Sequence, residues 1–495
     1  MTHALVLSLS HIEYTYPRSA EPVFGDITTT FTSGWTGIIG NNGCGKSTLA
    51  HIVCGILHPT KGSLTPKLTS TYCTQDATKE PSALFDFACD YSPDAIHLRT
   101  SLNIHDDMLW RFSELSTGEQ KKIQVAVALW MDPQVLVLDE PTNHVDATCR
   151  KELIHILSQY KGIGVLISHD RALLDSLVEQ CLCFEPGNII MRPGTYCEAK
   201  KQANSELRSL QQEKQQQKAR VEKLKKEHED RARKAAQSSA RRSARHLDKH
   251  DSDGRAKIGL AIVSGQDGKR ATLARRMDDR LSRERAGLSS TIVPKEYASA
   301  LWLETEPCAR KTLLHVPAHN MTTLQGHLIS VPAITLENTT HLGIKGANGI
   351  GKTTLITELH RSLAQQNERM PLRMLYLEQE VTQRDREEIA RKVAQLDKEE
   401  RGRLLSIVAQ LNSDPEQILA GCTTSPGEAR KIMLAYGIMM HPELIIMDEP
   451  TNHLDMNSIE ALEKALRFYP GALILVSHDE AFMNAIVHDV IELKS

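Results

Sequence analysis

The stretch G-N-N-G-C-G-K-S, from Gly40 to Ser47, recurs in the second half of the chain as G-A-N-G-I-G-K-T, from Gly346 to Thr353. Both match G-x-x-x-x-G-K-[S/T], in which glycines let successive backbone N–H groups converge on phosphate oxygens at the start of a helix. The run V-L-V-L-D-E-P-T-N-H-V-D ends at Asp146, and its copy L-I-I-M-D-E-P-T-N-H-L-D ends at Asp455, 309 positions later. These repeats predict two copies of one phosphate-binding domain.

Two shorter motifs repeat at the same offset of 309 residues. S-T-G-E begins at Ser116 and S-P-G-E at Ser425, while S-H-D begins at Ser168 and again at Ser477. Each half alternates helical patterns with short β-rich runs, as expected for buried parallel strands under crossover helices. The predicted strands are Trp35–Ile39, Val135–Leu138, Gly164–Ile167, Leu444–Met447 and Ala472–Val476. The expected fold class is α/β, with P-loop domains at residues 1–196 and 297–495 and a linker at 197–296.

Composition excludes several other classes of protein. The chain has 495 residues, of which 40% are hydrophobic and 24% charged, a balance that suits about three globular domains and excludes collagen-like or wholly disordered proteins. No run approaches the roughly 18 apolar residues of a membrane helix, and the first residues do not resemble a signal peptide. Ten cysteines without a C-x-x-C pair favour reduced thiols. We therefore expect a cytoplasmic protein without a membrane anchor.

The net charge of −3 conceals a strong asymmetry along the chain. Residues 200–285 carry 25 Lys plus Arg against 13 Asp plus Glu, a net charge of +12, which leaves −15 for the remainder. A basic segment therefore separates two acidic domains. Such a segment indicates either a polyanionic partner or simply the solvated face of a helix.

The two phosphate loops predict ATP as the ligand and Mg²⁺ as its metal ion. In the first half, Lys46 would hold the β- and γ-phosphates, Ser47 would bind Mg²⁺, and Asp139, ending an apolar strand, would complete the surroundings of the metal. The next residue, Glu140, is placed to polarise the attacking water. The counterparts in the second half are Lys352, Thr353, Asp448 and Glu449. The predicted chemistry is Mg²⁺-dependent hydrolysis of ATP to ADP and phosphate.

Together these motifs resemble those of an ATP-binding cassette (ABC) protein with two cassettes on one chain. The resemblance implies that L-S-T-G-E, from Leu115 to Glu119, is the signature with which one cassette contacts the nucleotide of the other. A hydroxyl, a close backbone approach and a helix N-terminus suit contact with a γ-phosphate. We therefore expect a monomer whose two cassettes form an intramolecular dimer with two composite sites. Lys46, Glu140 and His169 would face Ser425 and Gly427, and Lys352, Glu449 and His478 would face Ser116 and Gly118.

The resemblance also assigns the remaining site residues. His169 and His478 are similar to switch histidines that contact the γ-phosphate, and Gln75 and Gln379 to Q-loop glutamines near Mg²⁺. Tyr16 would either stack on adenine or be an ordinary aromatic at a strand end. The predicted catalytic residues are Glu140, Glu449, His169 and His478. The predicted Mg²⁺ ligands are Ser47, Gln75, Asp139, Thr353, Gln379 and Asp448. The predicted ATP contacts are Tyr16, Gly40, Asn41, Asn42, Gly43, Cys44, Gly45, Lys46, Ser47, Thr48, Gln75, Ser116, Gly118, Glu119, Gly346, Ala347, Asn348, Gly349, Ile350, Gly351, Lys352, Thr353, Thr354, Gln379, Ser425, Gly427 and Glu428.

The second cassette departs from the usual pattern in two ways. Its signature reads T-T-S-P-G-E, and Pro426 lacks an N–H and restricts φ. The site formed with the first P-loop is therefore expected to be the weaker hydrolytic site. In addition, residues 316–336 contain no aromatic residue that could stack on adenine before the second P-loop.

Further features resemble the ABC-F family. Both halves read D-E-P-T-N-H-[V/L]-D, R-P-G-T-Y ends at Tyr196 before a long charged linker, and no membrane segment is present. Only 70 and 73 residues separate the P-loop lysines from the signature serines, which leaves little room for the helical subdomain of a transporter cassette. The resemblance implies a protein that binds the ribosome when ATP closes the cassettes. Its linker would then reach the P-site tRNA, and it would modulate translation or protect the ribosome from antibiotics.

The linker pattern predicts a basic α-helical hairpin. Residues 200–236 form one expected helix, with Leu207, Leu210, Val221 and Leu224 at heptad-like spacing, and residues 271–286 form the return helix. Basic side chains on a rigid rod suit phosphate neutralisation, and an apolar tip at residues 258–263 suits a folded RNA pocket. The predicted RNA contacts are Arg241, Arg242, Arg245, Arg255, Lys257, Lys269, Arg270, Arg275 and Arg276.

Three alternatives remain open from the sequence. Within the ABC-F resemblance, the long linker favours antibiotic protection over a role as a translation factor. Outside it, the chain could be the ATPase subunit of a membrane transporter, although no stable membrane partner is expected. A DNA-repair cassette protein is disfavoured because zinc-type cysteine pairs are absent.

Overall fold

The computed structural model has two compact units. One combines residues 1–199 with 297–495, and the other is residues 200–296. The structure describes residues 5–17, 19, 21–143, 145–185, 188–241, 276, 279–284, 305–322, 328–367, 371–379, 381–413 and 426–493.

The first cassette is built on a six-stranded sheet with the order β5-β6-β7-β3-β8-β9. Its strands are β3 (Gly34–Gly40), β5 (Ser70–Cys73), β6 (Val135–Asp139), β7 (Ile163–Ile167), β8 (Val178–Glu185) and β9 (Asn188–Pro193). All neighbours are parallel except β8 and β9. Every residue of β6 and β7 is buried, because helices cover both faces of a parallel sheet and select continuous apolar runs. The predicted α/β class is confirmed.

An antiparallel sheet and the P-loop helix pack on one face of this sheet. The sheet has the order β2-β1-β4, from β1 (Val6–Tyr14), β2 (Phe24–Thr32) and β4 (Lys61–Thr65), and the helix is α1 (Lys46–Val53). Leu9, Phe31, Ile38 and Leu49 are fully buried in the apolar cluster that these elements share. This core fixes the position of the loop between β3 and α1.

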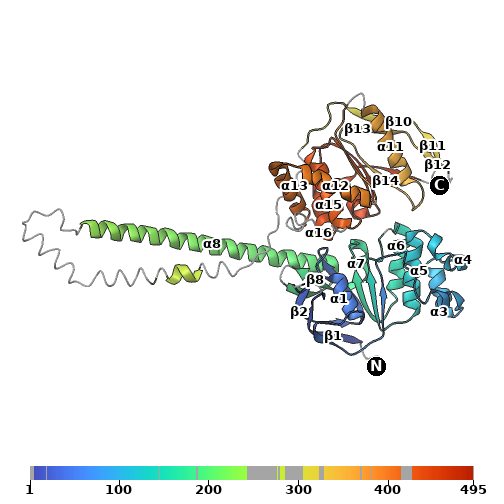
Figure 1. The fold of residues 1–495 in the computed structure, drawn as a ribbon, viewed down its shortest axis with the longest axis horizontal. Coiled ribbons are helices and arrows are strands. Elements are labelled where there is room, and N and C mark those ends of the chain that lie inside the picture. Colours follow the sequence, from blue (N-terminus) through green and yellow to red (C-terminus); the bar gives the residue numbers. More distant parts are fainter. Residues whose placement is uncertain are drawn as a thin grey trace, which may run out of the picture. The chain divides into compact units, whose positions relative to one another are not determined.

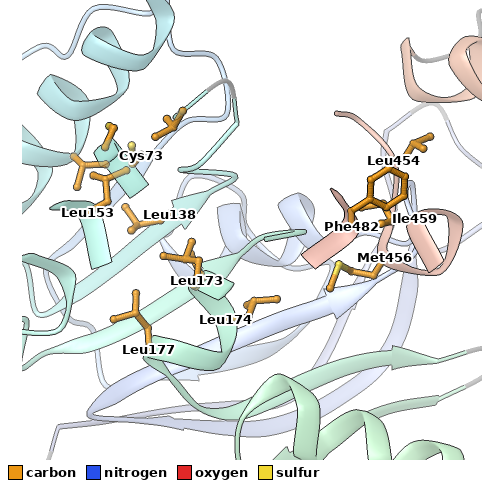
Figure 2. Packing of buried hydrophobic residues seen from close by; sticks show 14 of the residues in the cluster. Cys73, Leu138, Leu153, Leu173, Leu174, Leu177, Leu454, Met456, Ile459 and Phe482 are labelled. Carbon is orange, nitrogen blue, oxygen red and sulfur yellow. The ribbon is translucent and has the colours of Figure 1, made fainter. Parts of the chain in front are cut away.

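Among the other helices of the first cassette, α2 to α4 form a short helical subdomain. The other helices are α2 (Leu84–Cys89), α3 (Pro93–Ser101), α4 (Asp106–Leu109), the 3₁₀ turn η1 (Phe112–Glu114), α5 (Thr117–Trp130), α6 (Ala147–Leu157) and α7 (Arg171–Leu177). Helices α2 to α4 lie between Gln75 and the signature. The short spacing of 70 residues between Lys46 and Ser116 therefore leaves a helical subdomain that is short but present. Figure 2 shows Leu173, Leu174 and Leu177 of α7 in the buried cluster that also holds Leu138 of β6.

The second cassette repeats the same strand order. Its parallel sheet is β15-β16-β17-β14-β18, from β14 (His341–Lys345), β15 (Met374–Leu377), β16 (Leu444–Asp448), β17 (Ala472–Val476) and β18 (Asp489–Glu492). Two hairpins accompany it, β10 (Thr312–Val316) with β13 (Ile334–Glu337) and β11 (His319–Thr322) with β12 (Leu328–Val331). Its helices are α11 (Lys352–Asn367), α12 (Gln383–Gln395), α13 (Lys398–Gln410), α15 (Pro426–Met439), α16 (Met456–Arg467) and α17 (Glu480–Ile486). In both cassettes the P-loop strand lies between the strand that leads to S-H-D and the next strand along the chain. Figure 1 labels helices α11, α12, α13, α15 and α16 of the second cassette and its strand β14.

Helix α8 (Tyr196–Arg241) carries the chain into the linker. It has 46 residues, longer at both ends than the predicted span of 200–236, and would extend about 69 Å at 1.5 Å per residue. The Glu198 carboxylate caps its start by accepting from the Thr195 N–H at 2.9 Å. Leu207, Val221 and Leu224 are half-buried, whereas Leu210 is 40% exposed.

The rest of the predicted hairpin lies mainly outside the described residues. Residues 276 and 279–284, within the predicted return helix, are helical. The apolar tip at 258–263 is among the residues that the structure does not describe. Among the described helices, none combines the length and the apolar character that a membrane crossing requires.

Candidate active site

The second P-loop carries its lysine folded against the loop itself. Lys352 is 9% exposed, and its Nζ donates to the carbonyls of Gly346 at 2.9 Å and Ala347 at 3.1 Å. The same Nζ lies 3.2 Å from Nε2 of His478. The ammonium group and the loop N–H groups are thus gathered at the N-terminus of α11, where an anion is favoured.

A hydroxyl and a carboxylate meet beside this lysine. Thr353 Oγ1 donates to Asp448 Oδ2 at 2.8 Å, which joins the start of α11 to the end of β16. Oxygen ligands of these two kinds are those that Mg²⁺ accepts in nucleotide sites. In the first cassette, Asp139 Oδ2 instead accepts a hydrogen bond from the Tyr72 hydroxyl at 2.8 Å. The sequence analysis did not identify Tyr72.

Glu140 and Glu449, which directly follow the strand-ending Asp139 and Asp448, are both buried and held in the left-handed backbone region. Glu140 has φ 49° and Glu449 has φ 47°, and their N–H groups donate to the last residues of the neighbouring strands, Ile167 and Val476. Oε2 of Glu140 accepts from the His169 N–H at 3.2 Å, and Oε2 of Glu449 from the His478 N–H at 3.1 Å. Oε1 of each glutamate is buried and lies near the ring of the same histidine, 3.3 Å from Nε2 of His169 and 3.5 Å from Nε2 of His478, but accepts no hydrogen bond from a described residue. Each Oε1 therefore has hydrogen-bonding capacity that a water or a ligand can use.

Burial shifts the titration of these groups in opposite directions. Burial, with the charge of Asp139, raises the pKa of Glu140 to about 8, and burial raises the pKa of Glu449 to about 7. Burial and the neighbouring lysine cations lower the pKa of both His169 and His478. Both shifts follow from the cost of holding a charge out of water. Near neutral pH the histidines are therefore uncharged in this state.

The signature of the first cassette and the second P-loop line one cavity of about 340 Å³. Ser116, Thr117 and Gly118 contribute from the first cassette, whereas Lys352, Thr353, Gln379, Asp448, Glu449 and His478 contribute from the second. The volume lies in the range of small-molecule sites. The structure thus brings together one of the two predicted sets of composite-site residues.

Ser116 is fixed at the N-terminus of α5 by a capping box. Its N–H and hydroxyl both donate to Oε2 of Glu119, at 2.9 and 2.6 Å, and its Oγ accepts from the Glu119 N–H. The first-turn N–H groups of α5 therefore face the cavity, while the Glu119 carboxylate is engaged with Ser116. Glu119 supports the signature rather than pointing a free carboxylate at a nucleotide.

The other composite site is described only in part. Lys46 Nζ donates to the carbonyls of Gly40 and Asn41, both at 2.8 Å, as its counterpart does. Asn42 Nδ2 donates to the His453 carbonyl of the second cassette at 3.0 Å. A Cβ at Gly427 would lie 2.5 Å from the same carbonyl, so only glycine fits there. Ser425 lies outside the described residues, and Glu428 is in the first turn of α15.

Further predicted residues lie around the P-loops. The Tyr16 hydroxyl is 2.9 Å from Thr48 Oγ1, and its ring, 44% exposed, meets Tyr14 edge-on. Cys44 is half-buried, and burial raises the pKa of its thiol. Gln75 is exposed and does not line the cavity, whereas Gln379 does. Of the predicted RNA contacts, the structure describes only Arg276, which is helical and exposed, and the backbone of Arg241 at the end of α8.

Two buried cations in the signature helices hold the Q-loops, and the sequence analysis missed them. Lys121 is fully buried, and its Nζ donates to the carbonyls of Thr74 and Gln75 at 2.5 and 3.3 Å. Its counterpart Arg430 donates to the carbonyls of Gln379, Asp448 and Glu449 at 2.7, 2.9 and 2.8 Å. A cation two residues after each S-x-G-E glutamate, at the offset of 309, was the available signal.

A third missed residue, Arg150 of α6, joins the two cassettes. Its Nη2 donates to the His478 carbonyl at 3.2 Å, and its Nε lies 2.6 Å from Oδ2 of Asp170. It therefore bridges the S-H-D segments of both cassettes. The equivalent position of the second cassette is Ile459, so this bridge has no symmetric copy. Because Arg150 has no arginine at the equivalent position of the second cassette, the sequence repeats could not single it out.

The comparisons with known proteins agree with this geometry. The family described as ABC transporter matches residues 25–143 and again residues 331–452. A solved structure described as RNase-L Inhibitor has a TM-score of 0.60, covering 98% of this chain and 88% of that chain at 16% identity, and shows the fold. Fold and matches define a protein with two ATP-binding cassettes, that is, an ATPase of the ABC class that binds ATP.

Curated relatives refine this class. The chain is 29% identical to the ribosome protection protein VmlR of Bacillus subtilis, covering 97% of this chain and 85% of that protein. It is 26% identical to the erythromycin resistance ATP-binding protein MsrA of Staphylococcus epidermidis, covering 91% and 90%, and 27% identical to the ATP-binding protein Uup of Caulobacter vibrioides, covering 92% and 72%. These relatives, matched over more than nine tenths of this chain, support the predicted resemblance to the ABC-F family.

Proposed function

We propose that this protein hydrolyses ATP with Mg²⁺, binds the ribosome while ATP joins its two cassettes, and protects the ribosome from ribosome-targeting antibiotics. The observation that carries the proposal is the single cavity lined by the signature of one cassette and the P-loop of the other. A ligand that touches the signature of one cassette and the P-loop of the other stabilises the contact between the two cassettes. The closed state is therefore favoured when ATP is bound. The names of the VmlR and MsrA relatives support the ribosomal part.

In the second-cassette site the chain's own residues have distinct tasks. Lys352 leaves its loop carbonyls to bind the β- and γ-phosphates, and the N-terminus of α5 with Ser116 binds the γ-phosphate from the opposite wall. Thr353 and Asp448 would hold Mg²⁺, which neutralises charge on the phosphates. Their hydrogen bond and their oxygen chemistry fit this ion.

Glu449 and His478 would direct the attacking water. Oε1 of Glu449 is buried and lies 3.5 Å from Nε2 of His478 without a hydrogen bond to it, so it can accept one from water, while Oε2 stays bound to the His478 N–H. The His478 ring lies beside Lys352, where the γ-phosphate would arrive. The neutral imidazole can then donate its one ring N–H to the phosphate. Glu140, His169 and Lys46 would act alike in the other site.

The linker would provide the contact with RNA. Residues 200–285 carry a net charge of +12 in a chain whose net charge is −3, and the linker begins as the 46-residue helix α8. We propose that its cations neutralise phosphates of rRNA and P-site tRNA in the cytoplasm, with no stable membrane partner. Binding by counterion release falls steeply with salt, so ribosome binding should weaken as ionic strength rises.

The test of the protective role is drug susceptibility. Expression of the wild-type protein in an erythromycin-sensitive bacterial host should raise the inhibitory concentration of at least one drug in a ribosome-targeting panel that includes erythromycin. The Lys46→Ala, Lys352→Ala variant serves as the matched control. Unchanged susceptibility to every drug, with the wild-type protein recovered on ribosomes, would assign the protein to translation without protection.

The glutamate pKa values predict the pH dependence of hydrolysis. A carboxyl group accepts a proton from water only when it is ionised, so kcat/KM should rise as pH increases through about 7 to 8 and then level off. The measurement is the ratio of wild-type to Glu140→Gln, Glu449→Gln rates between about pH 6 and pH 9. Ionisation of ATP itself cancels in this ratio. A ratio that stays flat or falls with pH would contradict the assignment of the glutamates.

The Arg150 bridge predicts an asymmetric defect. Because Arg150 holds the His478 backbone, Arg150→Met should lower turnover at the second-cassette site about tenfold by misplacing the switch loop. In a Glu140→Gln background, where only that site hydrolyses, the loss should appear in kcat with little change in KM. In the Glu449→Gln background the same substitution should have a much smaller effect. Equal losses in both backgrounds would contradict the asymmetry and show that the contact with Asp170, next to His169, matters as much as the contact with His478.

A further inference from the structure

The helical subdomain of the first cassette exposes aromatic side chains that its core does not need. Phe85 of α2 is 66% exposed, Trp110 at the end of α4 is 60% exposed, and their ring centroids are 6.0 Å apart in an edge-on pair. Tyr91, in the turn before α3, is 66% exposed. The neighbouring Leu84 and Phe87 fill the core instead. We call the pair Phe85 and Trp110 the aromatic patch, and Tyr91 is a further exposed ring of the same subdomain.

The surroundings of the aromatic patch are acidic. Residues 84–114 contain six Asp plus Glu and two Arg, a net charge of −4. Arg99 is buried beneath Tyr91, 5.3 Å from the ring centroid, and pairs with Asp106 at 3.3 Å. Arg111 pairs with Asp107 at 2.7 Å. Both cations are thus engaged within the subdomain, while Asp86 and Asp94 face solvent.

The duplicated domain supplies an internal comparison. Helices α12 and α13 occupy the equivalent part of the second cassette, and none of their residues, all of which are described, is a large exposed hydrophobic side chain. Residues 383–410 carry seven Lys plus Arg against six Asp plus Glu. The described helices of this part of the second cassette therefore form with a charged, nearly neutral surface, and the exposed aromatic rings distinguish the first cassette from them.

We propose that the aromatic patch docks a basic protein segment, whose arginine and lysine side chains lie on the rings and pair with the surrounding carboxylates. Aromatic faces attract guanidinium and ammonium groups, and Trp and Tyr are enriched where protein partners bind. Platforms that stack nucleic-acid bases combine aromatic rings with positive charge, and here the charge is negative. The inference rests on the proposed function: the ribosome would offer RNA to the basic linker and a basic protein surface to this patch.

Charge reversal next to the patch distinguishes a protein partner from RNA. The Asp86→Lys, Asp94→Lys variant should bind ribosomes about tenfold more weakly if the partner is basic, and more tightly if the patch meets RNA phosphates. Both aspartates are exposed, so the fold should tolerate the change. Phe85→Ser with Trp110→Ser should weaken binding at least tenfold. Phe468→Ser, at a ring that is 76% exposed on the second cassette, is the matched control and should have no effect.

Photo-crosslinking identifies the partner directly. p-Benzoylphenylalanine replaces Phe85, and in a parallel sample Phe468, in the Glu140→Gln, Glu449→Gln protein, which is bound to purified ribosomes with ATP, irradiated and analysed by mass spectrometry. We expect position 85 to capture a Lys- or Arg-rich segment of a ribosomal protein that position 468 does not. Capture of rRNA, capture of this chain alone, or no capture from a co-sedimenting complex would overturn the inference. Failure to co-sediment at all would instead contradict the proposed function and the inference with it.

Discussion

The protein carrying Glu140→Gln and Glu449→Gln is expected to hydrolyse ATP at least about 100-fold more slowly than the wild type, because a general base contributes roughly 10²- to 10⁴-fold. Binding of ATP should be nearly unchanged, since neither carboxylate is needed to hold a phosphate. The fold should also tolerate the exchange. Burial already raises the pKa of both carboxyls to about 7 or 8, so the buried pocket accepts an uncharged side chain of the same size.

Steady-state turnover and equilibrium ATP binding measure this prediction. The two single variants are the internal controls, and they also report which site sets the rate. Pro426 precedes Gly427 at the first-P-loop site, so Glu449→Gln is expected to remove more of the wild-type rate than Glu140→Gln does. Turnover of the double variant within fivefold of the wild type would contradict the catalytic assignment.

The second large effect concerns stability. Lys431 Nζ lies 2.6 Å from Asp455 Oδ2, and the two side chains are 3% and 2% exposed. Lys431→Met would leave a buried carboxylate without its counter-charge, which costs about 3–5 kcal/mol of unfolding free energy. Asp455 also caps α16 by accepting from the Ser458 N–H at 2.9 Å, so the segment after the second D-E-P-T-N-H motif should loosen.

Urea unfolding of the full-length variants measures the loss. Adding Asp455→Asn to Lys431→Met should recover most of it, because asparagine keeps the helix cap and removes the charge. The counterpart Lys122 pairs with Glu152 at 2.6 Å but at 14% and 16% exposure, so Lys122→Met is the matched control and should cost much less. Equal costs for the two lysines, or no recovery in the double variant, would show that charge burial is not the cause.

Much of the fold followed from the sequence because its signals were duplicated. The apolar runs at Val135 and Leu444 became buried strands β6 and β16, and the P-loops appeared between β3 and α1 and between β14 and α11. The joining of Ser116 and Gly118 with Lys352 in one cavity was also predicted, from the family resemblance. Repetition at a fixed offset made each motif more informative than it would be alone.

What the sequence could not predict depends on contacts between distant residues. Arg150 has no repeated counterpart, and only the tertiary structure brings it to His478. Tyr72 belongs to an ordinary strand pattern until its hydroxyl reaches Asp139. Leu210 has heptad-like spacing in the sequence, yet on α8 the neighbouring Gln211 is half-buried and Leu210 is exposed. Periodicity gives a helix and its approximate face, but one residue of rotation decides which side chain is covered.

The most direct test of the central claim is co-sedimentation of the Glu140→Gln, Glu449→Gln protein with purified ribosomes, with and without ATP, at two salt concentrations. We predict that the protein pellets with ribosomes only when ATP is present, and that pelleting declines at the higher salt concentration because the linker binds through its cations. If the protein binds ATP, as equilibrium binding would show, but stays in the supernatant at both salt concentrations, then joining the cassettes does not create a ribosome-binding state and the proposed function is wrong.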